Sequence, residues 1–488
     1  MNKFTFKIIN KYTITLVSLF FAITTCLANN TLNTSFKEQY PGKNWMQYKT
    51  PEEAGWSADK LKKAYDYYKK IDCTKLMVVY KGKVLVSWGN VDRRLMCASV
   101  RKSFLSALYG IYAGKKEINI NSPLKKFAIT ATPPLSAKEQ QTTIKQMLTC
   151  TARIYRPGIG ESENFAKERM GLAKKIESIK KPYFYYNTWT FNVLGAIFNK
   201  ATKTDLFKDF YNQIAKPIGM QDFSLYDGWY ESFNKKEYPK YAFRMSTRDM
   251  ARFGLLYLRD GKWNNKQIIP KDWIEQSIKD YVKTREAFNG YGYLWWVCNT
   301  GNFKKDKVYA AIGVGAQTIA VVPKKDLVIV SRADYYYRNR SHWVRQKELL
   351  KLINLILKAK TKSPEKVPKL VPLLSTEKKI TPYKISKSCL KKVLGNYRLT
   401  LNFSKKELKE NELPSSVLNA EIKLHDNKII FTSPFTPGSK LILIPISKNK
   451  FMCRDSRWTL TFGKDKNGNE IFTWKIKNYS FILHKEND

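Results

Sequence analysis

The chain has 488 residues, of which 43% are hydrophobic and 14% aromatic, a composition that excludes a wholly disordered protein and leaves room for two or more domains. Its formal net charge is +46, yet the lysines are scattered and no nucleic-acid motif appears. We therefore expect no specific nucleic-acid partner, only a salt-sensitive, non-specific attraction to anionic polymers of the cell envelope.

Residues 1–28 are typical of an export signal. Three lysines precede the apolar run 13–22, and Ala28 offers a small residue for cleavage. We expect a periplasmic or secreted protein with no membrane span after cleavage, because no later segment has the roughly 18 apolar residues that a span needs. An uncleaved anchor is the alternative, whereas Thr25 disfavours a lipoprotein signal at Cys26.

Strand patterns lie at both ends of the region that follows. Residues 75–80 and 84–88 have the pattern of a β-hairpin, and residues 309–322 and 327–331 form a second predicted β pair. Between the pairs the chain is mostly helical in pattern, and residues 343–358 present a broad apolar face typical of a terminal helix. This order predicts an α+β fold, with one antiparallel sheet flanked by helices and an inserted helical subdomain.

We delimit this first domain as residues 29–358, and two further segments follow it. The Lys/Pro-rich stretch 359–384 has the composition of a linker. Beyond it, short β segments recur between turns, so residues 385–488 are predicted to form a small antiparallel β-domain.

Histidine and cysteine are too sparse to suggest the commonest catalytic and metal sites. The chain has three histidines, His342, His425 and His484, and neither a G-x-S-x-G nor an H-E-x-x-H motif. If the protein is a hydrolase, its base is therefore predicted not to be histidine. The six cysteines left after signal cleavage show no C-x-x-C spacing, so we expect structural thiols, with a Cys389–Cys453 disulfide as the alternative. We expect neither a metal nor a cofactor.

Ser99 and Lys102 offer a different nucleophile and base. A desolvated lysine can take the proton of a serine, and side chains three apart on a helix share a face. The apolar segment 104–111 predicts a buried helix with Ser99 at its amino end, where backbone N–H groups favour a developing oxyanion. The spacing alone is weak evidence. The same spacing recurs in polar, linker-like or surface contexts, for example at Ser57/Lys60, Ser122/Lys125, Ser178/Lys181, Ser363/Lys366 and Ser388/Lys391.

Further motifs follow Ser99-Val100-Arg101-Lys102 in a consistent order. Tyr185-Tyr186-Asn187 forms a Y-x-N motif, and the segments 217–222, 243–254 and 290–296 follow it. In the order and spacing of these motifs the chain, from about Gly42 to Lys358, resembles the β-lactamase-related serine hydrolases of the class C β-lactamase and D-Ala-D-Ala peptidase type. The resemblance implies a β-lactamase/transpeptidase-like fold and an acyl-enzyme.

The same resemblance implies roles for further residues. Tyr185 would transfer the proton, although a core aromatic is the alternative for it, and Asn187 would be a cleft residue that helps to position Lys102. The third motif falls on Ala311-Ile312-Gly313-Val314, where Gly313 would let the strand approach the substrate and Ile312 belongs to the substrate-binding segment. The N–H groups of Val314 and Ser99 would form the oxyanion hole.

Two segments depart from the family pattern, and the first of them bears on the substrate. Lactamases and peptidases of this type carry Lys-Thr-Gly or His-x-Gly in the third motif, but Ala311 takes the position of the cation. Its loss removes a charge-assisted contact to a substrate carboxylate, of roughly 1.5–3 kcal/mol. The segment is closer to that of esterases and 6-aminohexanoate-dimer hydrolase-like members. In residues 151–155, where relatives usually carry Ser-Gly, Tyr155 is expected to line the cleft.

We therefore expect a serine hydrolase that cleaves an ester or amide of a small molecule or short peptide through an acyl-enzyme on Ser99. A β-lactamase or D,D-carboxypeptidase acting on penicillins or peptidoglycan peptides is the first alternative. A non-catalytic cell-envelope binding protein is the second, and the intact first and second motifs argue against it.

Overall fold

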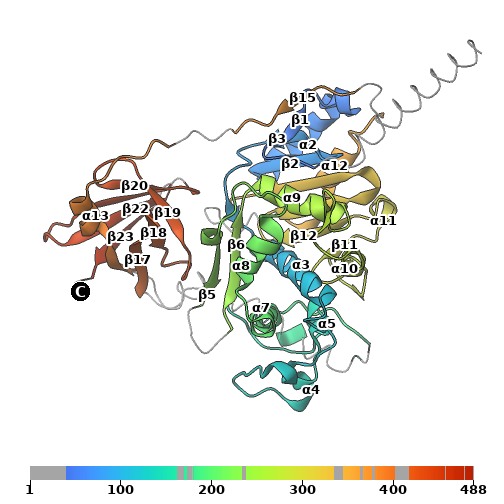
Figure 1. Cartoon of the computed structure of the whole chain (residues 1–488), viewed down its shortest axis with the longest axis horizontal. Coiled ribbons are helices and arrows are strands. Elements are labelled where there is room, and N and C mark those ends of the chain that lie inside the picture. The colour runs from blue at the N-terminus through green and yellow to red at the C-terminus, as the bar shows by residue number, and fades with distance from the viewer. Residues whose placement is uncertain are drawn as a thin grey trace, which may run out of the picture.

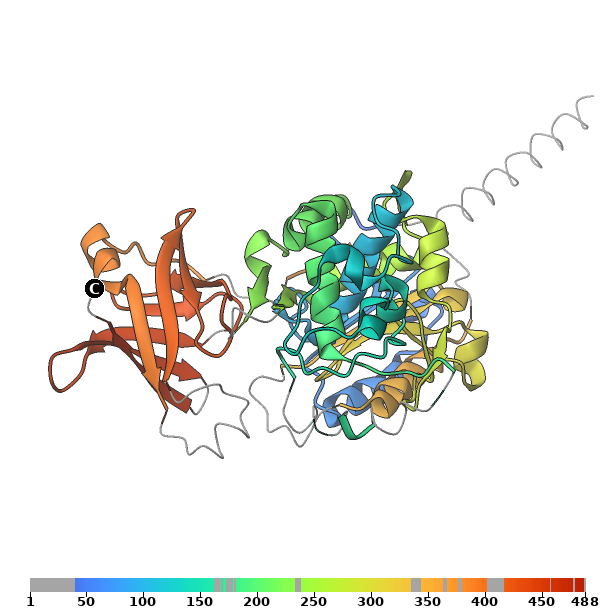
Figure 2. The same cartoon turned by 90° about the horizontal axis from the view of Figure 1, so that it is seen from below.

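The computed structural model describes residues 40–161, 167, 170–172, 179, 181–232, 238–334, 344–362, 367–375, 380–401, 417–456, 458–476 and 479–486. Within these residues the chain forms an N-terminal domain built on a large sheet and a C-terminal β-barrel (Figures 1 and 2). The predicted signal peptide and His342 lie outside the described residues. In the described part of the chain, no helix combines the length and apolarity needed to cross a membrane.

A ten-stranded sheet runs through the N-terminal domain in the order β15-β1-β3-β2-β14-β13-β12-β11-β10-β9. Its neighbours pair antiparallel, except β1 and β3, which are parallel. The central strands β2, β13 and β14 are rich in β-branched residues and buried along their whole length, which makes them the core of the sheet. The strands are β1 (Met46–Tyr48), β2 (Lys75–Tyr80), β3 (Lys83–Trp88), β9 (Val282–Lys283), β10 (Gly290–Tyr291), β11 (Trp296–Val297), β12 (Tyr309–Gly313), β13 (Gln317–Val322), β14 (Leu327–Arg332) and β15 (Leu370–Pro372).

The hairpin predicted at residues 75–88 is confirmed, but the single strand predicted over 309–322 is wrong. The chain forms β12 and β13, which pair with each other around a turn. Gly315 and Ala316 have φ values of 73° and 62°, and this left-handed backbone interrupts the extended run. As a consequence β12 ends at Gly313, next to the turn.

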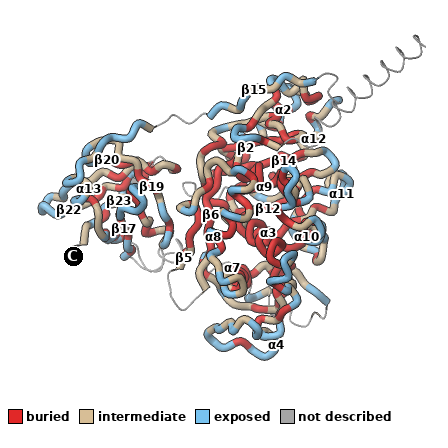
Figure 3. Tube along the Cα trace, viewed as in Figure 1, coloured by how far each residue is buried: buried red, intermediate tan, exposed pale blue. Residues whose placement is uncertain are grey.

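Helices surround the sheet and form the inserted subdomain that the sequence predicts (Figures 1 and 3). In helix α9 (Thr247–Leu258), a Cβ added to Gly254 would lie 2.6 Å from a methyl carbon of Val328 and 2.8 Å from one of Ile319, so α9 lies directly on β14 and β13. The terminal helix is α12 (Gln346–Leu357), which packs against α2 (Ala58–Lys70). The subdomain contains α4 (Ala137–Gln140), α5 (Ile144–Leu148), α7 (Thr188–Thr202) and α8 (Leu206–Asp209).

The C-terminal domain is a closed barrel of eight antiparallel strands, each paired with its neighbours in the sequence and the last with the first. Its interior holds packed aromatic side chains, among them Phe431, Trp458 and Trp474. The predicted α+β fold with a C-terminal antiparallel β-domain is therefore confirmed. The strands are β16 (Gly395–Thr400), β17 (Val417–His425), β18 (Lys428–Thr432), β19 (Leu441–Pro445), β20 (Lys450–Cys453), β21 (Thr459–Lys464), β22 (Glu470–Ile476) and β23 (Tyr479–Lys485).

Part of the predicted linker 359–384 belongs to the sheet. Strand β15 pairs with β1, with Gln47 opposite Val371. The barrel that follows lies beside the N-terminal domain, next to strands β5 (Gly228–Glu231) and β6 (Lys240–Met245) (Figures 1 and 2). Among the described residues Cys389 and Cys453 are not bonded to each other, so the disulfide alternative is not realised.

Candidate active site

Ser99 lies in a tight turn that opens the central buried helix. The 3₁₀ turn η2 (Ala98–Val100) leads directly into α3 (Arg101–Gly114), most of whose side chains are buried. Ala98 has φ 46°, an unfavourable conformation for a non-glycine residue, of the kind that concentrates at functional sites. An N–H group at the start of a helix has no acceptor within the helix, so the Ser99 N–H is placed to bind an anion.

Lys102 reaches Ser99 as the sequence predicts. The Lys102 Nζ atom donates a hydrogen bond to the Ser99 Oγ atom at 2.8 Å. Lys102 is only 4% exposed, and its Nζ lies 4.9 Å from the ring centre of Tyr186 and 4.5 Å from that of Phe191. Removal of an amine from water favours its neutral form, which is the form that accepts the proton of a serine.

The end of β12 approaches the Ser99 turn so closely that only glycine fits there. A Cβ added to Gly313 would lie 2.8 Å from both the Cys97 carbonyl oxygen and the Ser99 nitrogen. Val314 follows directly, at the edge where the predicted oxyanion hole lies. Because alternate residues of a strand share a face, Ala311 lies on the same face of β12 as Gly313 and is buried, while Ile312 lies on the other face and is partly exposed.

Tyr185 and Tyr155 form a second aromatic contact in the same region. Their ring centres lie 4.9 Å apart at a right angle, and Tyr185 is buried. The backbone N–H of Tyr185 donates to the Cys150 carbonyl at 2.7 Å, which ties the Y-x-N segment to the end of α5. Its neighbour Tyr186 is the ring that contacts Lys102. Tyr186 was not a predicted site residue, although its position within the Y-x-N motif is the signal that points to it.

Asn187 organises the backbone around this segment. Its Oδ1 atom accepts a hydrogen bond from the Thr190 N–H and caps α7, and its Nδ2 atom donates to the carbonyls of Ile154 and Arg156, each at 3.0 Å. These three bonds do not include Lys102. Asn187 thus joins the start of α7 to the 154–156 loop that carries Tyr155.

The other Ser/Lys pairs and the histidines described below lie in surroundings that differ from those of Ser99 and Lys102. The Ser57 hydroxyl caps α2 by accepting from the Lys60 backbone N–H, so that pair is a helix start. His425 and His484 belong to barrel strands, and His425 is exposed beside Asp426. Ser178, Ser363 and Lys366 lie outside the described residues.

Arg332 is the residue that sequence reasoning missed. It lies at the end of β14, is fully buried, and donates hydrogen bonds to the carbonyls of Leu95, Met96 and Met245 at 2.7–3.0 Å. The Gln317 side-chain oxygen accepts another. Since β4 (Leu95–Met96) leads into the Ser99 turn, Arg332 fixes that strand to the main sheet. Nothing in the local sequence signals this, because Arg332 is more than 200 residues away from its acceptors in β4.

Comparison with known families decides the assignment. The chain matches the Beta-lactamase family model over residues 61–348, which is more than half of its length and contains Ser99, Lys102, Tyr185 and Gly313. The chain belongs to the Beta-lactamase family. This Beta-lactamase-family membership confirms the resemblance found in the sequence, and it makes the protein a member of a serine hydrolase superfamily.

Several proteins resemble this Beta-lactamase-family chain at low identity. An uncharacterised protein from Alkalihalophilus pseudofirmus is 22% identical over 271 residues, which cover 49% of this chain and 73% of the relative. The structure titled "Putative 6-aminohexanoate-dimer hydrolase from Bacillus anthracis" is 18% identical with a TM-score of 0.48, over 66% of this chain and 87% of that one. An octameric penicillin-binding protein homologue from Pyrococcus abyssi is 15% identical with a TM-score of 0.44, over 88% and 99%.

Proposed function

We propose that the protein is a serine hydrolase that cleaves a small ester or amide through an acyl-enzyme on Ser99. The observation that carries this proposal is the 2.8 Å hydrogen bond between the Lys102 amine and the Ser99 hydroxyl, in a buried setting against the end of β12. A hydroxyl with a base at this distance is the arrangement of an activated nucleophile.

In the proposed reaction the Ser99 oxygen attacks the carbonyl carbon while its proton moves to Lys102. The N–H groups of Ser99 and Val314 stabilise the negative oxygen of the tetrahedral intermediate. Tyr185 delivers a proton to the leaving alcohol or amine as the carbon–heteroatom bond breaks, and the proton that Lys102 took from Ser99 then restores the Tyr185 hydroxyl. In the second half, water attacks the acyl-enzyme and gives a proton to Lys102. That proton passes to the Ser99 oxygen as the acid is released.

The buried Ala311 favours a substrate without a carboxylate beside the scissile bond. A lysine or histidine there would face the same side of β12 as Gly313, but alanine offers neither charge nor hydrogen bond. The aromatic rings around Lys102 add apolar surface, since Tyr186 stacks on Trp296 with ring centres 6.0 Å apart. This supports a substrate that lacks such a carboxylate over a penicillin or a D-alanyl peptide.

The test is covalent labelling of the full chain with a fluorophosphonate probe, with intact-mass detection of the adduct. We expect one adduct on the wild type and none on Ser99→Ala. Failure of the folded wild type to react would contradict the proposal. A panel of neutral esters, short amides and a chromogenic cephalosporin then identifies the substrate class. Ordinary enzymatic turnover of the cephalosporin would favour a β-lactamase instead.

A further inference from the structure

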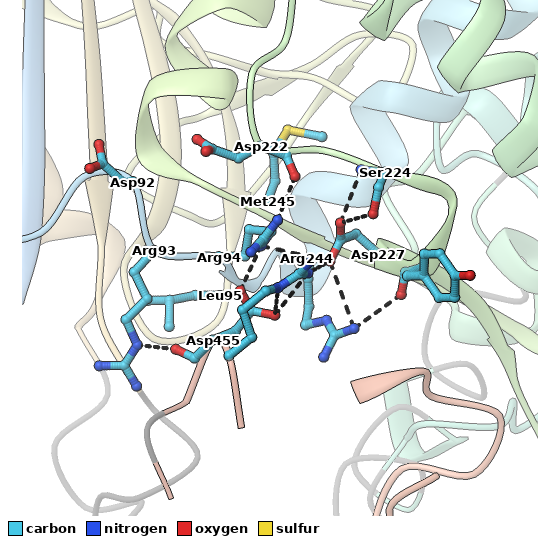
Figure 4. A network of polar contacts seen from close by, with 12 residues as sticks. Asp92, Arg93, Arg94, Leu95, Asp222, Ser224, Asp227, Arg244, Met245 and Asp455 are labelled. Carbon is cyan, nitrogen blue, oxygen red and sulfur yellow. Dashed lines mark hydrogen bonds and ion pairs between the residues drawn. The ribbon is translucent and has the colours of Figure 1, made fainter. Parts of the chain in front are cut away.

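The barrel contacts the segment that leads into Ser99 through a buried network of charges (Figure 4). Arg93 and Arg94 immediately precede β4, and both reach Asp455 of the barrel. The Arg94 Nε atom donates to the Asp455 carboxylate at 2.6 Å. Arg93 donates to the backbone carbonyl of Asp455 and, at 2.9 Å, to that of Ser456. The barrel therefore holds two consecutive residues that lie five and six positions before the nucleophile.

The network is closed by residues from both domains. Asp227, which is fully buried in the N-terminal domain, lies 3.3 Å from Arg454 of the barrel, 3.7 Å from Arg244 and 3.9 Å from Arg94. Arg454 also pairs with Asp455 at 3.1 Å. Three guanidinium groups thus share two carboxylates that are almost completely removed from water, and in such surroundings ion pairs are strong and the loss of one partner is costly.

Backbone packing brings the two domains close enough for this network. Arg244 donates to the Lys440 carbonyl of the barrel at 2.7 Å. A Cβ added to Gly438 would lie 2.3 Å from the Tyr230 carbonyl oxygen, so the barrel loop lies directly on β5. The charged contact at Asp455 is part of an extended, close-packed interface.

The segment between Arg94 and Ser99 is short, and backbone pairing with β6 holds it in place. Leu95 and Met96 pair with Met245 and Arg244 of β6, and the Cys97 N–H donates to the Phe243 carbonyl at 2.8 Å. Ser99 follows two residues later and is separated from Gly313 by a gap that would not admit one methyl group. At such a site a displacement of the order of 1 Å lowers the rate by about 10²-fold.

We infer that Asp455 is a positioning residue for the nucleophile: the barrel fixes Arg94, and through β4 it holds the Ser99 turn against β12. This inference rests on the proposed function of Ser99. Burial alone would raise the pKa of Asp455, but the charges of Arg94, Arg454 and Arg244 outweigh it and lower the pKa to about 2. Asp455 is therefore ionised throughout the neutral range, as the positioning role requires.

The experiment compares the full-length wild type with Asp455→Asn, which preserves shape and removes the charge. The matched control is Glu486→Gln, which removes an exposed ion pair to Arg398 within the barrel. We expect the maximal labelling rate with the fluorophosphonate probe to fall about tenfold in Asp455→Asn, with the probe concentration for half-maximal rate unchanged, and to stay within twofold in the control. Asp455→Glu should keep part of the labelling rate that Asp455→Asn loses. The double variant Arg94→Met/Asp455→Asn should be labelled only slightly more slowly than Asp455→Asn alone.

Hydrogen exchange of the same proteins separates positioning from general stability. We expect faster exchange in Asp455→Asn confined to residues 91–99, above all at the Cys97 amide, with the rest of the N-terminal domain unchanged. Equal rates and equal exchange in Asp455→Asn and wild type would overturn the inference, and so would faster exchange throughout the domain. If the wild type takes no label, the proposed function of Ser99 fails, and the exchange pattern alone decides whether Asp455 holds this segment.

Discussion

Gly313 lies so close to Ser99 that the position of strand β12 depends on the position of the Ser99 turn. A Cβ added to Gly313 would lie 2.8 Å from the Ser99 nitrogen, so no larger residue fits between β12 and η2 without a shift. Glycine at position 313 is therefore explained by the space beside Ser99 and not by the backbone conformation of the strand.

Gly313→Ala is expected to lower the labelling rate at Ser99 by about tenfold, because either β12 or the turn must move by several tenths of an ångström. The measurement is the second-order rate constant for fluorophosphonate labelling. Gly463→Ala is the matched control, since a Cβ added to this strand glycine of the barrel meets nothing within 4 Å. A Gly313→Ala protein that reacts like the control would show that the contact has no role in the reaction.

Lys102→Arg is expected to reduce hydrolysis and labelling by at least about 10²-fold while the protein stays folded. The guanidinium keeps the charge but does not release a proton at accessible pH, so it does not serve as a base. The initial rate on the best ester of the panel measures this. Lys60→Arg, on the exposed face of α2 three residues after Ser57, should behave as wild type. Comparable activity in Lys102→Arg would mean that another group takes the Ser99 proton.

Arg332→Met is expected to lower the free energy of unfolding by at least about 3 kcal/mol. The substitution removes the charged donor from the buried carbonyls of Leu95 and Met96, and hydrogen bonds to a charged group contribute about 1.5–3 kcal/mol each. Urea denaturation followed by tryptophan fluorescence measures the change. Arg398→Met, at a side chain that is 56% exposed, should change stability by less than about 0.5 kcal/mol. A similar small effect at both positions would contradict the role assigned to Arg332.

Lys75 is expected to make the free energy of unfolding depend on pH in the alkaline range. Burial, together with the Arg93 and Arg332 charges, lowers the pKa of Lys75 from its ordinary 10.5 to about 8, although Asp334 opposes the change. Between these two values the unfolded chain binds more protons than the folded one, so this group makes stability rise from pH 8 to 10.5. Below pH 8 the buried charge lowers the free energy of unfolding by about 3 kcal/mol.

Lys75→Met is the variant that tests this effect. It should be more stable than the wild type at pH 7, and the difference should shrink as the pH approaches 10.5. Melting temperatures of both proteins across this range give the comparison, and Lys83→Met serves as the control. Burial also lowers the pKa of Lys83, but Lys83 is only half-buried, so the effect of its replacement should be smaller. A constant difference between wild type and Lys75→Met at all pH values would rule out the buried charge as its cause.

Much of the fold and part of the site follow from local sequence. The hairpin of β2 and β3, the helix α3 behind Ser99 and the barrel strands are all encoded by patterns within a few residues. The spacing of Ser99 and Lys102 allows their hydrogen bond, and the later motifs distinguish this pair from the others with the same spacing. The division of residues 309–322 into two strands is not predicted because the apolar segments on both sides of Gly315 and Ala316 each have a strand pattern.

The contacts that hold the Ser99 segment in place cannot be predicted from local sequence patterns. Arg332 and Asp455 lie more than 200 and more than 300 residues from the segments they hold, and each is one of many charged residues in the chain. What distinguishes them is burial, and burial is decided by how whole domains pack. Asn187 shows the same limit, because its bonds to Ile154 and Arg156 depend on where a distant loop returns.

The pairing of β1 with β15 has a consequence for the order in which the sheet is completed. Strand β1 lies near the start of the described chain, but the partner of its outer edge, Leu370–Pro372, follows more than 300 residues later. On the inner side β1 pairs with β3, which is close in the sequence. An open strand edge can pair with a wrong strand. This edge therefore stays open during folding until the segment just before the barrel has joined the sheet.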